Sequence, residues 1–282
     1  GATGEELADL EQQAKDLGKS TQYSAIQSAE AMEQLASAGF NATEIYAAMP
    51  GLLDLAATDN IELASAAEIA ATAINGFGLE AGDVGHVADV LAESAARTNA
   101  SVSSLGYSFK YVAPYSQALG VTIEETAAAI GILSDAGIKG TSAGTTLRGM
   151  FSRLAKPTEK AQEIMEGLGI TVYDNEGKFR SISDIIGIVG EKTAGLSEEE
   201  RNFALATIFG QQALTGVLAL MEAGPEEINE LTASYQGCEG AAKEMADTIN
   251  DNTKGAWIEF KSALEGAAIA IGEVLLPHIK KG

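Results

Sequence analysis

The chain has 282 residues, of which 46% are hydrophobic, 21% are charged and 6% are aromatic. This composition supports a folded core and excludes an intrinsically disordered chain, and the length allows one large domain or two smaller ones. The formal net charge of −22, from 18 Lys and Arg against 40 Asp and Glu, argues against nucleic-acid binding because such a chain repels phosphates.

Apolar residues recur at helical spacing through most of the chain, beginning with residues 84–95 and 105–119. Pro114 should kink or shorten the second of these helices, because proline has no amide hydrogen to continue the ladder. Thr122 and Glu125 then stand at the spacing of a capping box, which predicts a helix ending at Gly137. A further apolar stripe covers 143–154.

Residues 170–180 break this helical pattern. Residues with β propensity flank the turn-forming run Asp174-Asn175-Glu176-Gly177, which predicts a small β-hairpin or an extended excursion. Helix-start signals return at Ser181 and Ser197, and Gly224-Pro225 separates a further helix that ends near Gly237. From about 240 to 276 there is no proline, and apolar residues recur every third or fourth position, which predicts a long C-terminal helix.

The expected fold class is therefore all-α, an irregular array of short packed helices with one small hairpin or excursion near 170–180. The 31 glycines and many alanines allow helices to approach closely. We divide the chain into a helical lead-in, a helical core module, a second helical module with the hairpin, and the long C-terminal helix, at 1–20, 21–156, 157–237 and 238–282. No signal peptide is recognisable at the start, and the ends of the sequence are those expected of a piece of a longer protein.

One short motif matches a catalytic pattern. Gly140-Thr141-Ser142-Ala143-Gly144 fits Gly-x-Ser-x-Gly, which places a nucleophilic serine on a strained turn between a strand and a helix. Here the preceding segment is predicted to be helical, and the one histidine that follows is His278. We therefore interpret the segment as a helix–helix junction and not as a catalytic turn.

The remaining motifs are weaker and are interpreted as helix caps or turns. Gly18-Lys19-Ser20, Lys139-Gly140-Thr141 and Gly76-Phe77-Gly78 each match only part of a phosphate- or dinucleotide-binding loop. Asp174–Gly177 lacks the further ligands of a calcium loop. His86 is interpreted as an ordinary helix residue and the single cysteine, Cys238, as a small apolar filler. The sequence thus predicts no catalytic, cofactor-binding or metal-binding residue, no cofactor and no enzyme activity.

Phe203–Met221 contains no charged residue and is nearly long enough to span a bilayer. Gly210, Gln211 and Gln212 lie near its centre, which favours two short buried helices over one membrane span.

Several longer stretches, taken in order, resemble the core region of phage tail tape measure proteins of the TP901 type. The resemblance covers about Leu35 to Leu220 and is most specific at Gly137–Arg148. The other segments that carry it are Leu35–Phe40, Met49–Ala57, His86–Ala92, Phe109–Pro114, Arg153-Leu154 with Pro157, Leu168-Gly169-Ile170 with Asp174 and Gly177, and Ile208-Phe209-Gly210.

The resemblance implies a structural phage or prophage tail protein, a tape measure that sets tail length and scaffolds tube assembly. It implies as partners the tail-tube protein, tail assembly chaperones and tail-tip proteins, with self-association of the full-length protein, and a location in the virion tail and in the host cytoplasm during assembly. No nucleic-acid binding is expected. The alternatives are a membrane-active module that aids genome passage across the cell envelope, with membrane contact through Phe203–Met221, and a peptidoglycan-cleaving enzyme.

Overall fold

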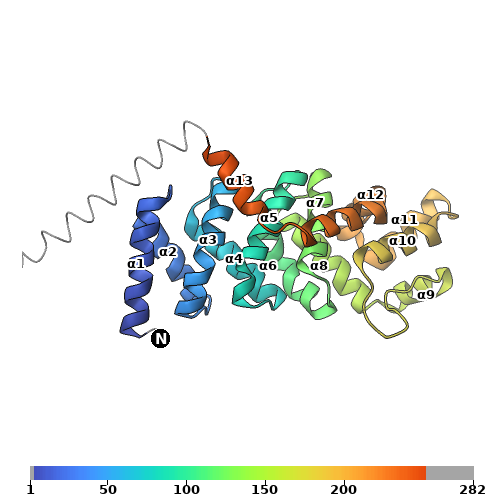
Figure 1. Cartoon of the computed structure of the whole chain (residues 1–282). Helices are drawn as coiled ribbons and strands as arrows, with labels where there is room; N and C mark the ends of the chain where they lie inside the picture. The colour runs from blue at the N-terminus through green and yellow to red at the C-terminus, as the bar shows by residue number, and fades with distance from the viewer. Residues whose placement is uncertain (1–2, 252–282) are drawn as a thin grey trace, which may run out of the picture. The chain divides into compact units, whose positions relative to one another are not determined.

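The computed structural model describes residues 3–251, which form α-helices joined by turns and by one longer non-helical segment at 169–181 (Figure 1). The helices follow in the order α1 (Gly4–Ser20), α2 (Ala25–Ser37), α3 (Ala42–Thr58), α4 (Leu63–Phe77), the 3₁₀ turn η1 (Ala81–Asp83), α5 (Val84–Arg97), α6 (Val102–Leu119), α7 (Ile123–Asp135), α8 (Thr141–Ala155), α9 (Glu159–Leu168), α10 (Ile182–Thr193), α11 (Glu198–Phe209), α12 (Gln211–Gln236) and α13 (Ala241–Asn250). Within these residues no strand is present, so the all-α prediction is confirmed.

The described residues gather into two compact units. The first contains the residues up to Ala71, then Glu80–Ala88, and those from Gly240 to 251. The second contains Thr72–Leu79 and Asp89–Glu239. The four-part division of the chain at 20, 156 and 237 stays a prediction.

Short polar side chains begin most of the helices by satisfying amide hydrogens that have no partner inside the helix. Ser197 and Glu200 cap α11 reciprocally, as the sequence predicts. Thr122 and Ser181 cap α7 and α10 through their hydroxyl groups alone. Reciprocal boxes that the sequence reading did not single out begin the helices α1, α2, α3 and α6, at Thr3, Ser24, Asn41 and Ser101.

The core of the second unit is built around α7, which packs against α6, α8 and α12. Ten of its thirteen residues are buried, Ile130 among them. Phe109 of α6 is also fully buried and meets Phe77 edge to face, with ring centroids 5.1 Å apart. Aromatic contacts of this kind are few, and the remaining core consists mainly of Leu, Ile, Val and Ala side chains.

Small residues bring the helices of this unit together, as the glycine content predicts. A Cβ atom added to Gly144 of α8 would lie 2.4 Å from the backbone oxygen of Ser108 in α6. A Cβ atom on Gly216 of α12 would lie 2.4 Å from Cγ2 of Thr146. Real Cβ atoms do not approach other atoms so closely, so both contacts require glycine.

Of the two alternatives that the sequence predicts for 170–180, a small β-hairpin or an extended excursion, the hairpin is wrong. This segment forms a single antiparallel bridge between Tyr173 and Phe179, too short to count as a strand. Backbone hydrogen bonds join the two flanks only next to the turn, from the Asp174 amide to the Lys178 carbonyl oxygen and from the Arg180 amide to the Val172 carbonyl oxygen, both at 2.9 Å. One carboxylate oxygen of Asp174 also accepts hydrogen bonds from the amides of Glu176 and Lys178, at 2.8 and 2.9 Å. The side chain therefore holds the chain in a tight loop, and the helical signal at Ser181 ends any further pairing.

Proline and glycine act differently from one position to another. α6 continues past Pro114 to Leu119, so of the two effects expected of Pro114, a kink or a shorter helix, the shortening does not occur. At Gly224 the backbone leaves the helical region, with φ 81° and ψ 169°, and α12 is two helices joined at this break, as predicted. α13 covers the start of the predicted long C-terminal helix, and the rest of that prediction lies outside the described residues.

Candidate functional site

The Gly-x-Ser-x-Gly segment begins a helix and does not form a nucleophile turn. Ser142 is exposed in the first turn of α8, and its amide donates to the carbonyl oxygen of Lys139 at 3.2 Å. The carbonyl oxygen of Gly140 instead accepts a hydrogen bond from the hydroxyl group of Ser108, at 2.8 Å. Because α7 precedes the segment, the strand that the catalytic motif requires is replaced by a helix.

The partial phosphate-binding motifs lie at the ends of helices. Gly18 is buried near the end of α1, where an added Cβ atom would lie 2.4 Å from the backbone nitrogen of Ala25. Gly78 follows α4 with φ 68° and lies against the side chain of Gln117. Both glycines are therefore explained by chain turns and close packing.

The acidic turn at Asp174 is held by its own backbone. The amide of Lys178, and then that of Glu176, lowers the pKa of the Asp174 carboxyl group by hydrogen bonding to it. Among the described residues, no group of three or more His, Cys, Asp or Glu side chains is arranged to hold a metal ion.

Cys238 is buried, and its Sγ atom lies 2.8 Å from the backbone oxygen of Tyr235. Burial, reinforced by the carboxylates of Asp89 and Glu93, raises the pKa of the Cys238 thiol to about 12. A thiol that holds its proton in this way is a poor nucleophile at neutral pH. The geometry agrees with the packing role predicted for Cys238.

Phe203–Met221 is divided between two helices, α11 and the first part of α12. Gly210 separates them with φ 83° and ψ 151°, which is the break expected from the sequence. Of the described helices, none alone has the length and apolar character of a membrane span; α11 and α12 pass that test only as a pair bent by 115°.

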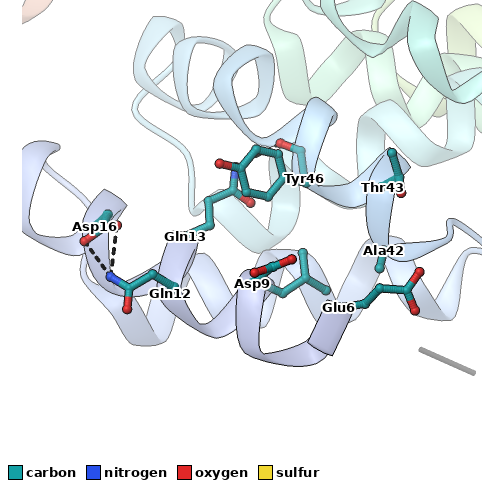
Figure 2. A pocket seen from close by; sticks show the side chains of 9 residues that line it. Glu6, Asp9, Gln12, Gln13, Asp16, Ala42, Thr43 and Tyr46 are labelled. Atoms are coloured by element: carbon teal, nitrogen blue, oxygen red, sulfur yellow. Dashed lines mark hydrogen bonds between the residues drawn. The ribbon is translucent and has the colours of Figure 1, made fainter. Parts of the chain in front are cut away.

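A groove of about 430 Å³ lies between α1 and α3 in the first unit (Figure 2). Glu6, Asp9 and Asp16 of α1 line it together with Tyr46 of α3, whose side chain is 53% exposed. The Nε2 atom of Gln13 donates to the backbone oxygen of Tyr46 at 2.9 Å and so joins the two helices. We call this surface the acidic groove.

The matching family model is that of the phage-related minor tail proteins, and it covers residues 11–210. The chain belongs to this family. It is 48% identical over 281 residues, all of its own length, to the tape measure protein of Pneumococcus phage Dp-1. It is 34% identical over 266 residues, 92% of its length, to a probable tape measure protein of Escherichia phage P2.

The chain spans about a quarter of the first of these relatives and about a third of the second, at 24% and 32% of their lengths. No solved structure matches it. Family membership confirms the resemblance drawn from the sequence and places the chain among phage tail proteins.

One interhelical contact was missed by sequence reasoning. Glu125 has the right spacing to complete a capping box with Thr122, yet its Oε1 atom accepts a hydrogen bond from the amide of Ile182, the first residue of α10. One side chain of α7 thus caps a helix that begins 57 residues later. In the sequence, Glu125 stands at capping-box spacing from Thr122 whether or not its carboxylate caps α7. Only the folded structure shows that it accepts from the amide of Ile182 instead.

Proposed function

We propose that this chain is a section of a tape measure protein, which sets the length of a phage tail and scaffolds assembly of the tail tube. The observation that carries this proposal is the 48% identity to the Pneumococcus phage Dp-1 tape measure protein along the whole chain. A match of this extent includes the packed cores as well as short motifs, so it supports a shared structural role.

The charge of the chain fits a protein that shares a tail with a genome. With a formal net charge of −22, the chain repels phosphate backbones and leaves DNA free to move past it. The role needs no catalytic group, which agrees with the prediction of no catalytic, cofactor-binding or metal-binding residue.

The packing of the section bears on how it contributes to length. A continuous helix extends by about 1.5 Å for each residue. In the second unit, α6, α7 and α8 pack against one another, so the lengths of these helices do not add along one axis. We infer that this section adds less tail length per residue than a helical rod, and that extended parts of the parent protein supply most of the ruler.

The expected partners are the tail-tube protein, the tail assembly chaperones and the tail-tip proteins, with self-association of the full-length protein. The section would lie in the virion tail after assembly and in the host cytoplasm before it. These assignments follow from the proposed role and stand as expectations.

The proposed function is tested by measuring tail length after the section is deleted or duplicated. Two in-frame deletions of equal size are compared by electron microscopy of phage particles: one removes residues 3–251, and the other removes a stretch of the parent outside this chain. We expect both deletions to shorten tails, with the second approaching about 1.5 Å per residue and the first clearly below it.

A tandem duplication of the section keeps one intact copy for assembly and so remains informative if the deletion stops tail formation. We expect the duplication to lengthen the tail by less than a rod of equal residue number. Intact particles with normal tail length in all three variants would overturn the tape measure role.

A further inference from the structure

A cavity of about 530 Å³ lies in the second unit, where α10 ends and α11 begins. We call it the Arg201 cavity. The turn after α10, the first turns of α11 and one residue of α12 line it. Its lining includes Ala194, Leu196, Glu198, Arg201, Asn202 and Leu218. A space of this size suits a small ligand or the last few residues of a peptide.

The two sides of the Arg201 cavity differ in chemistry. Glu198, Arg201 and Asn202 follow the spacing i, i+3 and i+4, which places them on one side of α11. Leu196 and Leu218 supply apolar surface, and neither leucine is fully buried. The cavity therefore offers one polar side and one apolar side to a ligand.

The guanidinium group of Arg201 has no partner within residues 3–251. In this part of the chain no carboxylate pairs with it, and no oxygen atom accepts a hydrogen bond from its Nε atom, which is closed off from solvent. A charged donor that lacks an acceptor inside a protein costs free energy. An acceptor supplied by a ligand would lower that cost.

The neighbouring carboxylates do not supply this acceptor. Glu200, next to Arg201 in the sequence, accepts hydrogen bonds from the amide and the hydroxyl group of Ser197, at 2.9 and 2.6 Å. Glu198 lines the cavity, yet among the described residues it forms no ion pair with Arg201. Arg201 is therefore open to a carboxylate from outside the chain.

Arg148 of α8 provides a contrast. It also forms no ion pair within the described residues, but its guanidinium group lies 5.8 Å from the ring centroid of Tyr111, a cation–π contact. Tyr111 stands on α6 between Tyr107 and Tyr115, which are 61% and 41% exposed. The charge of Arg148 thus has an aromatic partner on an open surface, whereas Arg201 lines a cavity and has no partner in the described part of the chain.

The lining specifies the chemistry of the ligand. A guanidinium group donates in a planar fork that matches the two oxygen atoms of a carboxylate. The carboxylate of Glu198 only accepts hydrogen bonds, so it suits an N–H group, and Asn202 can donate or accept. Leu196 and Leu218 suit an aliphatic group. A carboxylate, an N–H group and an aliphatic side chain on one carbon atom are the parts of an α-amino acid.

We propose that the Arg201 cavity binds an α-carboxylate with an aliphatic side chain beside it. Arg201 binds the carboxylate, Leu196 and Leu218 contact the side chain, and Glu198 accepts from the nitrogen atom of the ligand. The carboxyl terminus of a protein and a free amino acid such as leucine share this chemistry. The proposal is independent of the tape measure role, because it concerns a cavity inside one unit of the chain.

Three probes test the site by chemical-shift titration of the isotope-labelled 282-residue chain. N-acetylalanylleucine has a free carboxylate, its carboxamide has none, and free leucine adds an ammonium group. We expect the peptide acid to bind with a Kd of about 1 mM and to shift the amides of the lining residues. The carboxamide should bind about tenfold or more weakly, because it loses the charge-assisted hydrogen bonds to Arg201.

Arg201→Gln separates the cavity from other surfaces of the chain. We expect its affinity for the peptide acid to fall about tenfold or more, with the affinity for the carboxamide unchanged. Arg148→Gln makes the same chemical change at an exposed residue of α8 and should bind the peptide acid like the wild-type chain. Circular dichroism checks that both variants keep their helices. The comparison of acid with carboxamide in the wild-type chain needs no variant, so it remains decisive if Arg201→Gln does not fold.

Glu198→Gln distinguishes the two sources of the ligand. Free leucine that binds more tightly than the peptide acid, and that loses affinity in this variant, would assign the site to a free amino acid, whose ammonium group pairs with Glu198. A peptide acid that binds more tightly than leucine, and that keeps its affinity in this variant, would assign the site to a protein carboxyl terminus.

Four results would overturn the proposal. The first is the same affinity for the peptide acid and its carboxamide in the wild-type chain. The second is wild-type affinity for the peptide acid in a folded Arg201→Gln variant. The third is a set of shifted amides that lies away from the lining residues. The fourth is no response to either carboxylate probe at any concentration.

Discussion

Helices α1 and α7 begin in the same way and end in very different surroundings. Thr3 and Thr122 each cap the first turn with a hydroxyl group. Of the seventeen residues of α1, only Ala14 and Gly18 are buried, whereas ten of the thirteen residues of α7 are buried. Capping therefore sets where a helix starts, and the apolar content of its faces decides how much it contributes to the stability of its unit.

The largest loss of stability is expected when a buried side chain of α7 is truncated. Ile130→Ala removes a fully buried side chain from the centre of the second unit, and we expect it to cost about 4 kcal/mol of unfolding free energy. Leu7→Ala in α1 changes a side chain that is 62% exposed, and should cost less than about 0.5 kcal/mol.

Amide hydrogen exchange resolved by segment measures both effects, because it reports each unit separately. Protection should fall in α6, α7, α8 and α12 of the first variant and stay unchanged in the second. Equal losses in the two variants would contradict the assignment of α7 as the core helix.

A smaller effect is expected where helices touch through glycine. Gly144→Ala places a Cβ atom against the backbone of Ser108, which must shift, and we expect a loss of about 2 kcal/mol after the gain in helix propensity is subtracted. Gly149→Ala in the same helix has nothing within 4 Å of the new atom and should stabilise α8 by up to about 1 kcal/mol. Urea unfolding followed by circular dichroism compares the pair, and the same sign for both would contradict close packing at Gly144.

These pairs also show what the sequence could and could not predict. The helix starts at Ser181 and Ser197 and the breaks at Gly210 and Gly224 follow from local chemistry, and the structure confirms them. The hairpin prediction failed because Ser181 caps α10 directly after the second flank, so backbone pairing ends at the hydrogen bond from the Arg180 amide to the Val172 carbonyl oxygen.

The candidate surfaces were beyond prediction for a different reason. Tyr107, Tyr111 and Tyr115 recur at helical spacing in the sequence, yet the spacing gives no sign that Tyr107 and Tyr115 are exposed on α6. The acidic groove joins α1 to α3 through Gln13 and Tyr46, which are 33 residues apart and share no motif. Only the packing of the helices decides both.

The smallest effect concerns the carboxylate that joins α7 to α10. Burial, and then the nearby Asp184, raises the pKa of Glu125 above its ordinary value of 4.5, although the amides of Ile182 and Ser183 counteract part of the shift. The folded chain thus holds this proton to a higher pH than the unfolded chain does. The unfolding free energy should therefore fall as pH rises from 4.5 through the raised pKa.

Glu125→Gln removes this titration and should flatten that part of the stability profile, measured as urea midpoints at a series of pH values. Glu200→Gln provides a control of opposite sign, because the hydroxyl and amide of Ser197 lower the pKa of Glu200. Its carboxylate adds stability above pH 4.5 that is lost as pH falls through the lowered pKa. Each stability profile is compared with that of the wild-type chain. The same change of slope in both variants would contradict a buried Glu125, whereas opposite changes would show that the fold disfavours the charge of Glu125, which is buried, and favours the charge of Glu200, which caps its own helix at the surface.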